Sequence, residues 1–148
     1  MVDCIVCCVL CVVCCVLCVV CCEFDNNCWY NIGRIDNNEQ FEEAAIRETK
    51  EEAGVDVELT GILRVEFSPM HRYARMRVIF MARPVSEDQL PKSMPDYESC
   101  GASWVTLEEL QELPLRGKEP VQWITYLSKG GQVAPLSVLT LEGARCDI

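Results

Sequence analysis

Apolar and polar residues alternate along the chain in two different periods, which predict both strands and helices. Alternation with a period of two, rich in β-branched and aromatic residues, indicates strands. It occurs in Asp56–Phe67, and strands are also predicted at Arg75–Arg83 and Cys100–Val105. Gly61 predicts a bend in the first of them, and Pro84 ends the second.

A period near four predicts the longest helix of the chain. Its apolar stripe is formed by Phe41, Ala45, Thr49 and Ala53, and Gly54 follows where a left-handed residue would close the last turn. Two further helices are predicted, one capped by Thr106 and one from Pro120 to about Leu127. The connections Asn31–Gly33, Ser68–Ala74 and Ser86–Tyr97 are predicted loops, and the tail Val133–Ile148 is predicted to add a final extended segment.

Residues 4–22 contain only Cys, Val, Leu and Ile, and a seven-residue unit is repeated within them. The run is long enough for a membrane helix, but no Lys or Arg flanks it. A secretory signal is disfavoured because the start carries no positive charge, and a metal cluster because nothing between the cysteines can turn the backbone. We favour core strands, with Cys15–Cys22 as one strand, then a polar turn and a short second strand, and keep a membrane segment as the alternative.

Composition places the chain among single-domain proteins. It has 148 residues, a formal net charge of −10 and a pI of about 4.5, so the positive surface of a nucleic-acid-binding protein is missing. All its cysteines except Cys28, Cys100 and Cys146 lie in the apolar run, which argues against a disulfide framework. A polyanionic substrate would therefore need cations to bridge it to this protein.

Three carboxylates crowd one face of the predicted helix over 41–53. Glu48 lies three positions before Glu51 and four before Glu52, so their side chains are neighbours. Carboxylate oxygens are the ligands that Mg²⁺ and Mn²⁺ prefer. A solvated acidic helix face explains the same residues, and the carboxylates alone leave both interpretations open.

The residues around these glutamates resemble a known motif. The chain reads Gly33, five residues, Glu39, seven residues, and then Arg47-Glu48-Thr49-Lys50-Glu51-Glu52-Ala53-Gly54-Val55. This resembles the Nudix box, G-x5-E-x7-R-E-U-x-E-E-x-G-U, in which U is a bulky apolar residue. Thr49 is the one soft match. The segment Trp29–Gly33 departs from the family in being one residue short and lacking a proline.

The resemblance implies a fold, a cofactor and roles for particular residues. The expected fold is a Nudix-type α/β/α sandwich with a mixed β-sheet, in which residues 1–22 are the apolar N-terminal segment and 23–148 the remainder of one domain. Mg²⁺ (or Mn²⁺) would be held by Glu48, Glu51, Glu52 and Glu98, and Glu51 and Arg47 would act in catalysis. Glu39 would support the junction of loop and helix. Gly33, Trp29 and Phe67 are candidate contacts to substrate, although Trp29 and Phe67 suit ordinary core packing equally.

The C-terminal half resembles the branch of the family that hydrolyses oxidised guanine nucleotides. The short matches are Arg77–Pro84, Glu98 with Trp104, Leu113–Arg116 and Ala134–Leu136. They imply an 8-oxo-(d)GDP substrate and a monophosphate product. Ser68-Pro69 lies about where ADP-ribose-cleaving relatives place a proline, so ADP-ribose or another nucleotide sugar is the alternative substrate. A non-catalytic Nudix module that binds a nucleotide or a protein is the alternative of another class. The expected partner is a small nucleotide and no nucleic-acid polymer. The expected location is cytoplasmic, with membrane association through residues 4–22 as the alternative.

Overall fold

The computed structural model describes the backbone of residues 2–10, 17–22, 28–29, 31–69, 71, 74–97 and 99–145, and side chains from Arg34 onward. Strands and helices follow one another as β1 (Val2–Leu10), β2 (Leu17–Cys22), β3 (Cys28–Trp29), β4 (Asn31–Arg34), α1 (Phe41–Ala53), β5 (Val57–Pro69), β6 (Ala74–Pro84), β7 (Gly101–Thr106), α2 (Leu107–Glu112), α3 (Glu119–Ser128) and the 3₁₀ helix η1 (Leu136–Val138). Within the described ranges, no helix has the length and apolar character needed to cross a membrane.

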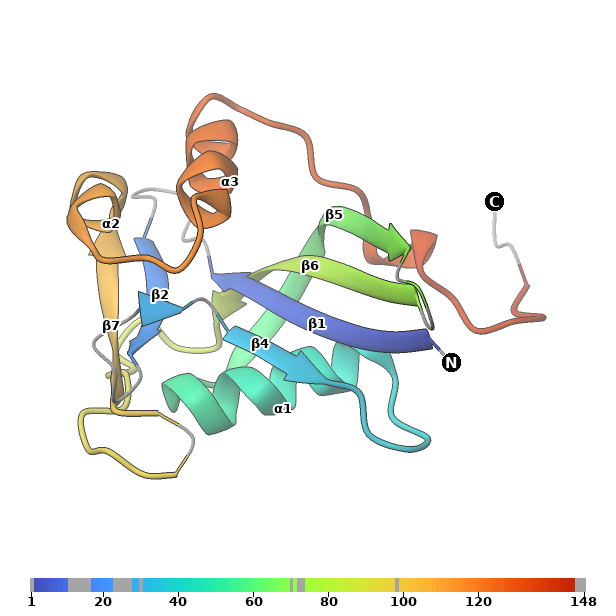
Figure 1. The fold of residues 1–148 in the computed structure, drawn as a ribbon, viewed down its shortest axis with the longest axis horizontal. Helices are drawn as coiled ribbons and strands as arrows, with labels where there is room; N and C mark the ends of the chain where they lie inside the picture. Colours follow the sequence, from blue (N-terminus) through green and yellow to red (C-terminus); the bar gives the residue numbers. More distant parts are fainter. Residues whose placement is uncertain are drawn as a thin grey trace.

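The strands form two sheets (Figure 1). The larger has the order β4-β1-β6-β5, and the smaller has the order β3-β2-β7. Strand β1 runs parallel to β6, from Val2 beside Ala74 to Leu10 beside Ala82, whereas all the other pairs are antiparallel. The larger sheet is therefore mixed, as predicted. The second sheet was not foreseen, because the sequence pattern does not show which strands pair.

Helices cover both faces of the larger sheet. Successive side chains of a strand point to opposite faces, and β6 shows the consequence. Val78 and Phe80 are fully buried in the cluster that contains the inner face of α1, whereas Ile79 is buried in a second cluster with residues of α2 and α3. Figure 1 shows α1 on one side of this sheet and α3 on the other. The result is the expected α/β/α sandwich.

Strands occupy the described parts of the apolar N-terminal run. β1 lies between β4 and β6 inside the larger sheet, and β2 lies between β3 and β7 in the smaller one. Valine-rich segments suit such positions, because β-branched side chains pack well on a pleated surface that is covered on both sides. Leu17–Cys22 falls within the predicted strand Cys15–Cys22, whose first two residues lie outside the described ranges, and β3 follows where a short second strand was predicted.

Three predictions about connections were wrong. Asn31–Gly33 is part of β4 rather than a loop, since β1 offers it an edge on which Gly33 pairs with Val6. The connection between β5 and β6 is shorter than predicted, because Ser68 and Pro69 continue β5 opposite Arg75 and Ala74. The described part of the tail contains the 3₁₀ turn η1 and one isolated bridge instead of a strand. In each case a partner distant in sequence decides the outcome.

The tail lies close to β5 at Gly61, where a bend was predicted. The register of β5 on β6 shifts between Leu59 and Gly61. The next residue, Ile62, exchanges two backbone hydrogen bonds with Ala134, of 2.8 and 2.9 Å. A β-carbon on Gly61 would lie 2.7 Å from the Ala134 carbonyl oxygen and 2.5 Å from Val133 Cγ1. Glycine is needed here because the tail backbone approaches this closely.

Candidate active site

Helix α1 places the candidate chemistry on one face by burying the other. Ala45, Thr49 and Ala53 are fully buried against the sheet, as the apolar stripe predicted. Thr49 is polar at a position where the motif has an apolar residue. Its hydroxyl donates to the Ala45 carbonyl at 2.7 Å, so it leaves no unpaired donor in the core. The helix ends at Gly54, whose φ of +74° confirms the predicted left-handed cap.

A tight turn before α1 positions Glu39. The Glu39 amide donates to the Asp36 carbonyl at 3.1 Å, and the Asp36 amide donates back to Glu39 Oε2 at 2.9 Å. Asn38 has a positive φ of 69° inside this turn, a conformation that Asn tolerates better than most residues. The turn therefore aims the Glu39 carboxylate toward the exposed face of α1.

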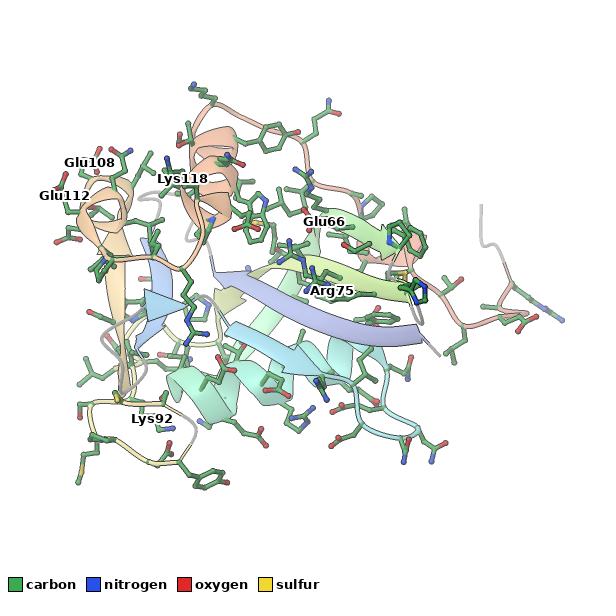
Figure 2. All side chains as sticks on the ribbon, viewed as in Figure 1. Glu66, Arg75, Lys92, Glu108, Glu112 and Lys118 are labelled. Carbon is green, nitrogen blue, oxygen red and sulfur yellow. The ribbon has the colours of Figure 1, made fainter. Side chains whose placement is uncertain are left out.

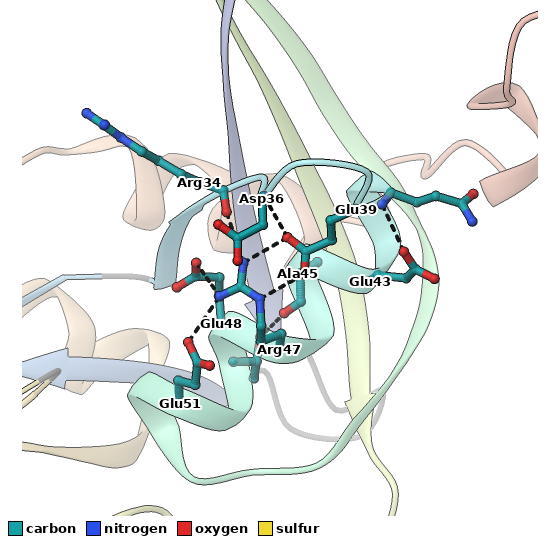
Figure 3. Close-up of polar contacts among 10 residues, drawn as sticks. Arg34, Asp36, Glu39, Glu43, Ala45, Arg47, Glu48 and Glu51 are labelled. Atoms are coloured by element: carbon teal, nitrogen blue, oxygen red, sulfur yellow. Dashed lines mark hydrogen bonds and ion pairs between the residues drawn. The ribbon is translucent and has the colours of Figure 1, made fainter.

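Arg47 is the centre of the site (Figure 3). Its Nε and Nη2 atoms donate to the two oxygens of Glu39 at 2.7 and 2.9 Å, a bidentate pair. Nη1 donates both to Glu48 Oε1 at 2.8 Å and to Glu51 Oε2 at 3.0 Å. Nη2 also donates to the carbonyl of Arg34, at the end of β4, at 3.0 Å. One guanidinium thus joins β4, the turn before α1 and two turns of α1.

The network is partly shielded from water, which strengthens the attraction between the Arg47 guanidinium and the three glutamates. The side chains of Glu39 and Glu48 are 14% and 15% exposed, against 43% for Glu51. The hydrogen bond from Arg47 holds the pKa of Glu39 below its ordinary value, although burial opposes this. Glu39 in turn raises the pKa of Arg47 above its usual range, so the guanidinium stays charged.

This pKa shift predicts how stability depends on pH. Because the Glu39 pKa is lower in the folded state, the pair stabilises the fold above the ordinary value of 4.5 and loses this contribution as pH falls through the folded pKa. We expect Glu39→Gln to lower the free energy of unfolding by about 1–2 kcal/mol near neutral pH, with the gap to the wild type closing in acid. Denaturant titrations across the acidic range measure this gap. Glu58→Gln, at a 60% exposed position, is the control; an equal gap at every pH would contradict the expectation.

The donor chemistry of α1 fits a divalent cation. Glu48 and Glu51 already share one cationic centre, Arg47 Nη1, so their carboxylates converge on the same point. Glu52 follows Glu51 in the same turn and is half-buried. Among the residues whose side chains are described, no group of three or more Asp, Glu, His or Cys is arranged to hold a metal ion. In this structure Glu48 and Glu51 are instead engaged by Arg47.

The remaining predicted site residues are distributed over several strands. Gly33 lies in β4, one residue before the carbonyl that Arg47 contacts, and Trp29 ends β3. Phe67 lies on β5 and is 67% exposed, so it is not an ordinary core residue. Glu98 lies outside the described residues. The structure therefore brings Glu39, Arg47, Glu48 and Glu51 together by direct contacts.

Two residues that the sequence analysis missed lie at the other end of α1. Lys92 Nζ donates to the Glu51 carbonyl and Ser99 Oγ to the Glu52 carbonyl, each at 2.7 Å. Both belong to the connection between β6 and β7, which the sequence analysis treated only as a loop. No local pattern marks them, since the contacts span 41 and 47 residues of chain.

Comparison with known proteins agrees with this geometry. The family model described as "NUDIX domain" matches residues 32–125, which begin within β4, include α1 and end within α3. The chain therefore belongs to the Nudix family. A solved NUDIX hydrolase from Nitrosomonas europaea superposes with a TM-score of 0.75 at 20% identity, covering 97% of this chain and 100% of that one. An ADP-ribose pyrophosphatase from Streptococcus suis gives 0.65 at 18% identity, covering 86% and 92%.

A curated relative from Caenorhabditis elegans is considerably longer. It carries the name "Putative nudix hydrolase 1" and is 32% identical over an alignment of 111 positions, which covers 69% of this chain and 28% of that protein. The chain thus spans little more than a quarter of this relative. At 18–20% identity, the solved structures establish the shared fold alone.

Proposed function

We propose that this chain is a Mg²⁺-dependent hydrolase that cleaves the phosphoric anhydride of a nucleoside diphosphate derivative and releases a monophosphate. The observation that carries the proposal is the Arg47 network, in which one guanidinium orients the carboxylates of Glu48 and Glu51 on the motif helix of a Nudix fold. A binding module would have little reason to keep Glu48, Glu51 and Glu52 together on one helix face. Hydrolases of this family generally use divalent metal ions.

The residues of the site have different proposed roles. Glu48, Glu51 and Glu52 would hold Mg²⁺ (or Mn²⁺), which when bound supplies positive charge against that of a diphosphate. Arg47 orients the carboxylates of Glu48 and Glu51, and Glu39 holds the Arg47 guanidinium in place from the opposite side. Glu51, the most exposed carboxylate that Arg47 contacts, accepts the proton of the attacking water as the anhydride P–O bond breaks. Glu98 would add an oxygen ligand, and Gly33, Trp29 and Phe67 would contact the nucleotide.

For the substrate, we favour an oxidised purine nucleotide such as 8-oxo-(d)GDP. The short matches in the C-terminal half support this choice, and the exposure of Phe67 makes an aromatic surface available for a base. The competing substrate is ADP-ribose, which the name of one structural neighbour contains. The net charge of −10 favours metal bridging of any such polyanion.

A substrate panel tests the proposal. Purified protein is incubated with 8-oxo-dGDP, 8-oxo-dGTP, ADP-ribose and a dinucleoside polyphosphate, with Mg²⁺ or with a chelator, and the products are separated. We expect the monophosphate to form from 8-oxo-dGDP fastest, and only with metal. Preference for ADP-ribose would overturn the substrate assignment. Lack of turnover across the panel would favour the non-catalytic binding module.

A further inference from the structure

The last turn of α1 is completed by a distant loop. The final carbonyls of a helix have no partners within the helix and must be satisfied from outside. Here the β6–β7 loop supplies three donors. Lys92 Nζ reaches the Glu51 carbonyl at 2.7 Å, Ser99 Oγ reaches the Glu52 carbonyl at 2.7 Å, and the Lys92 amide reaches the Ala53 carbonyl at 2.8 Å. Figure 2 labels Lys92 on this loop, beside α1.

The donors are themselves held in place. Lys92 Nζ forms an ion pair with Asp96 at 2.5 Å, and the Lys92 carbonyl accepts from the Ala102 amide of β7 at 2.8 Å. The Ser99 amide donates to Asp96 Oδ1 at 3.1 Å, and the Asp96 amide donates back to the Ser99 carbonyl at 3.0 Å. Ser99 is 2% exposed and the Lys92 side chain 15%, so water competes weakly for these bonds.

Gly54 shows how closely the loop approaches. Beyond its positive φ, a β-carbon on Gly54 would lie 3.1 Å from Lys92 Cβ. Gly54, at the end of the motif helix, therefore also leaves room for the close approach of the Lys92 backbone. Two of the three contacted carbonyls belong to Glu51 and Glu52, so the loop holds the backbone of two residues whose side chains the proposed metal site requires.

We propose that Lys92 and Ser99 are positioning residues, which set the orientation of the last turn of α1 and thereby the affinity of Glu51 and Glu52 for a divalent cation. This inference rests on the proposed function, because it assumes that these carboxylates bind the cation. Groups that orient metal ligands from behind typically change affinity by about 10- to 100-fold when they are removed.

The direction of the effect separates positioning from simple charge. Lys92→Met keeps the apolar stem but removes a positive charge near the site, and on electrostatic grounds alone a divalent cation would then bind more tightly. Positioning predicts the opposite, since the last turn loses a donor. Lys50→Met is the matched control. Lys50 belongs to the same turn, but its ammonium pairs with the side chain of Asp56 at 2.7 Å, and both side chains are more than half exposed.

Mn²⁺ binding, followed by the electron paramagnetic resonance signal of the free ion, tests the proposal without requiring turnover. We expect Lys92→Met and Ser99→Ala each to raise the Mn²⁺ dissociation constant about tenfold, Lys92→Arg to restore part of the affinity, and Lys50→Met to leave it unchanged or slightly tighter. Denaturant titration checks that each variant is folded at the assay temperature. If Lys92→Met does not fold, the Mn²⁺ affinity of Ser99→Ala tests the proposal.

The possible failures are distinguishable. A wild-type protein that binds no Mn²⁺ overturns the proposed metal site itself. Wild-type binding that Lys92→Met leaves unchanged or tightens, together with unchanged binding by Ser99→Ala, overturns the positioning role alone. Equal weakening by Lys92→Met and Lys50→Met would also overturn it, because the Lys50 ammonium pairs with Asp56 rather than with the carbonyls of Glu51 or Glu52.

Discussion

Replacing Glu51 by glutamine is expected to reduce metal-dependent hydrolysis by about 10²- to 10⁴-fold, the usual contribution of a group that transfers a proton in the transition state. The amide has nearly the same shape as the carboxylate, but it can neither accept the proton of water nor offer a charged oxygen to Mg²⁺. The fold should be little affected. Glu51 is 43% exposed, and an exposed ion pair such as the one it forms with Arg47 contributes only about 0–1 kcal/mol.

The measurement is kcat/KM on the best substrate of the panel, together with the midpoint of denaturant unfolding. Glu58→Gln is the matched control, because it removes the same charge from an exposed ion pair, with Arg83, on β5. We expect the control to retain wild-type activity. If Glu51→Gln retained it too, Glu51 would not be the proton acceptor.

Replacing Arg47 by lysine is expected to lower both stability and turnover, although the charge is conserved. Lysine concentrates its donors on one nitrogen, so it cannot span both oxygens of Glu39 while also reaching Glu48 and Glu51. The carboxylates of Glu39 and Glu48 would remain shielded from water but would accept fewer hydrogen bonds. Hydrogen bonds to charged groups are worth about 1.5–3 kcal/mol each, so we expect a loss of about 2 kcal/mol. Turnover should fall about 10- to 100-fold through misplaced glutamates.

Arg83→Lys provides the comparison. Arg83 also donates from two nitrogens to a glutamate, Glu58, at 3.0 and 2.7 Å, but its side chain is 61% exposed. The exchange there should change the unfolding free energy by less than about 0.5 kcal/mol. Both variants are compared by denaturant titration and by kcat/KM. Equal, small effects at Arg47 and Arg83 would mean that the network does not organise the site.

The sequence by itself determined the motif helix and its chemistry. The four-residue stripe located the buried face of α1, the cap at Gly54 and therefore the exposed face that carries Glu48 and Glu51. Its agreement with the Nudix box also indicated the sandwich fold. These features are local: side chains three and four positions apart on a helix are neighbours in any context. Strands β5, β6 and β7 were located for the same reason, since short apolar runs, alternating in β5, are visible without knowing the partner strand.

Only the tertiary structure decided which distant segments meet. A strand needs an edge to pair with, and no local pattern shows that β1 would supply one to both β4 and β6, or that the tail would cross β5 beside Gly61. The same holds within the site. The bonds from Arg47 to Glu39 and to the carbonyl of Arg34, and those from the β6–β7 loop to the last turn of α1, join residues that become neighbours only when the chain has folded.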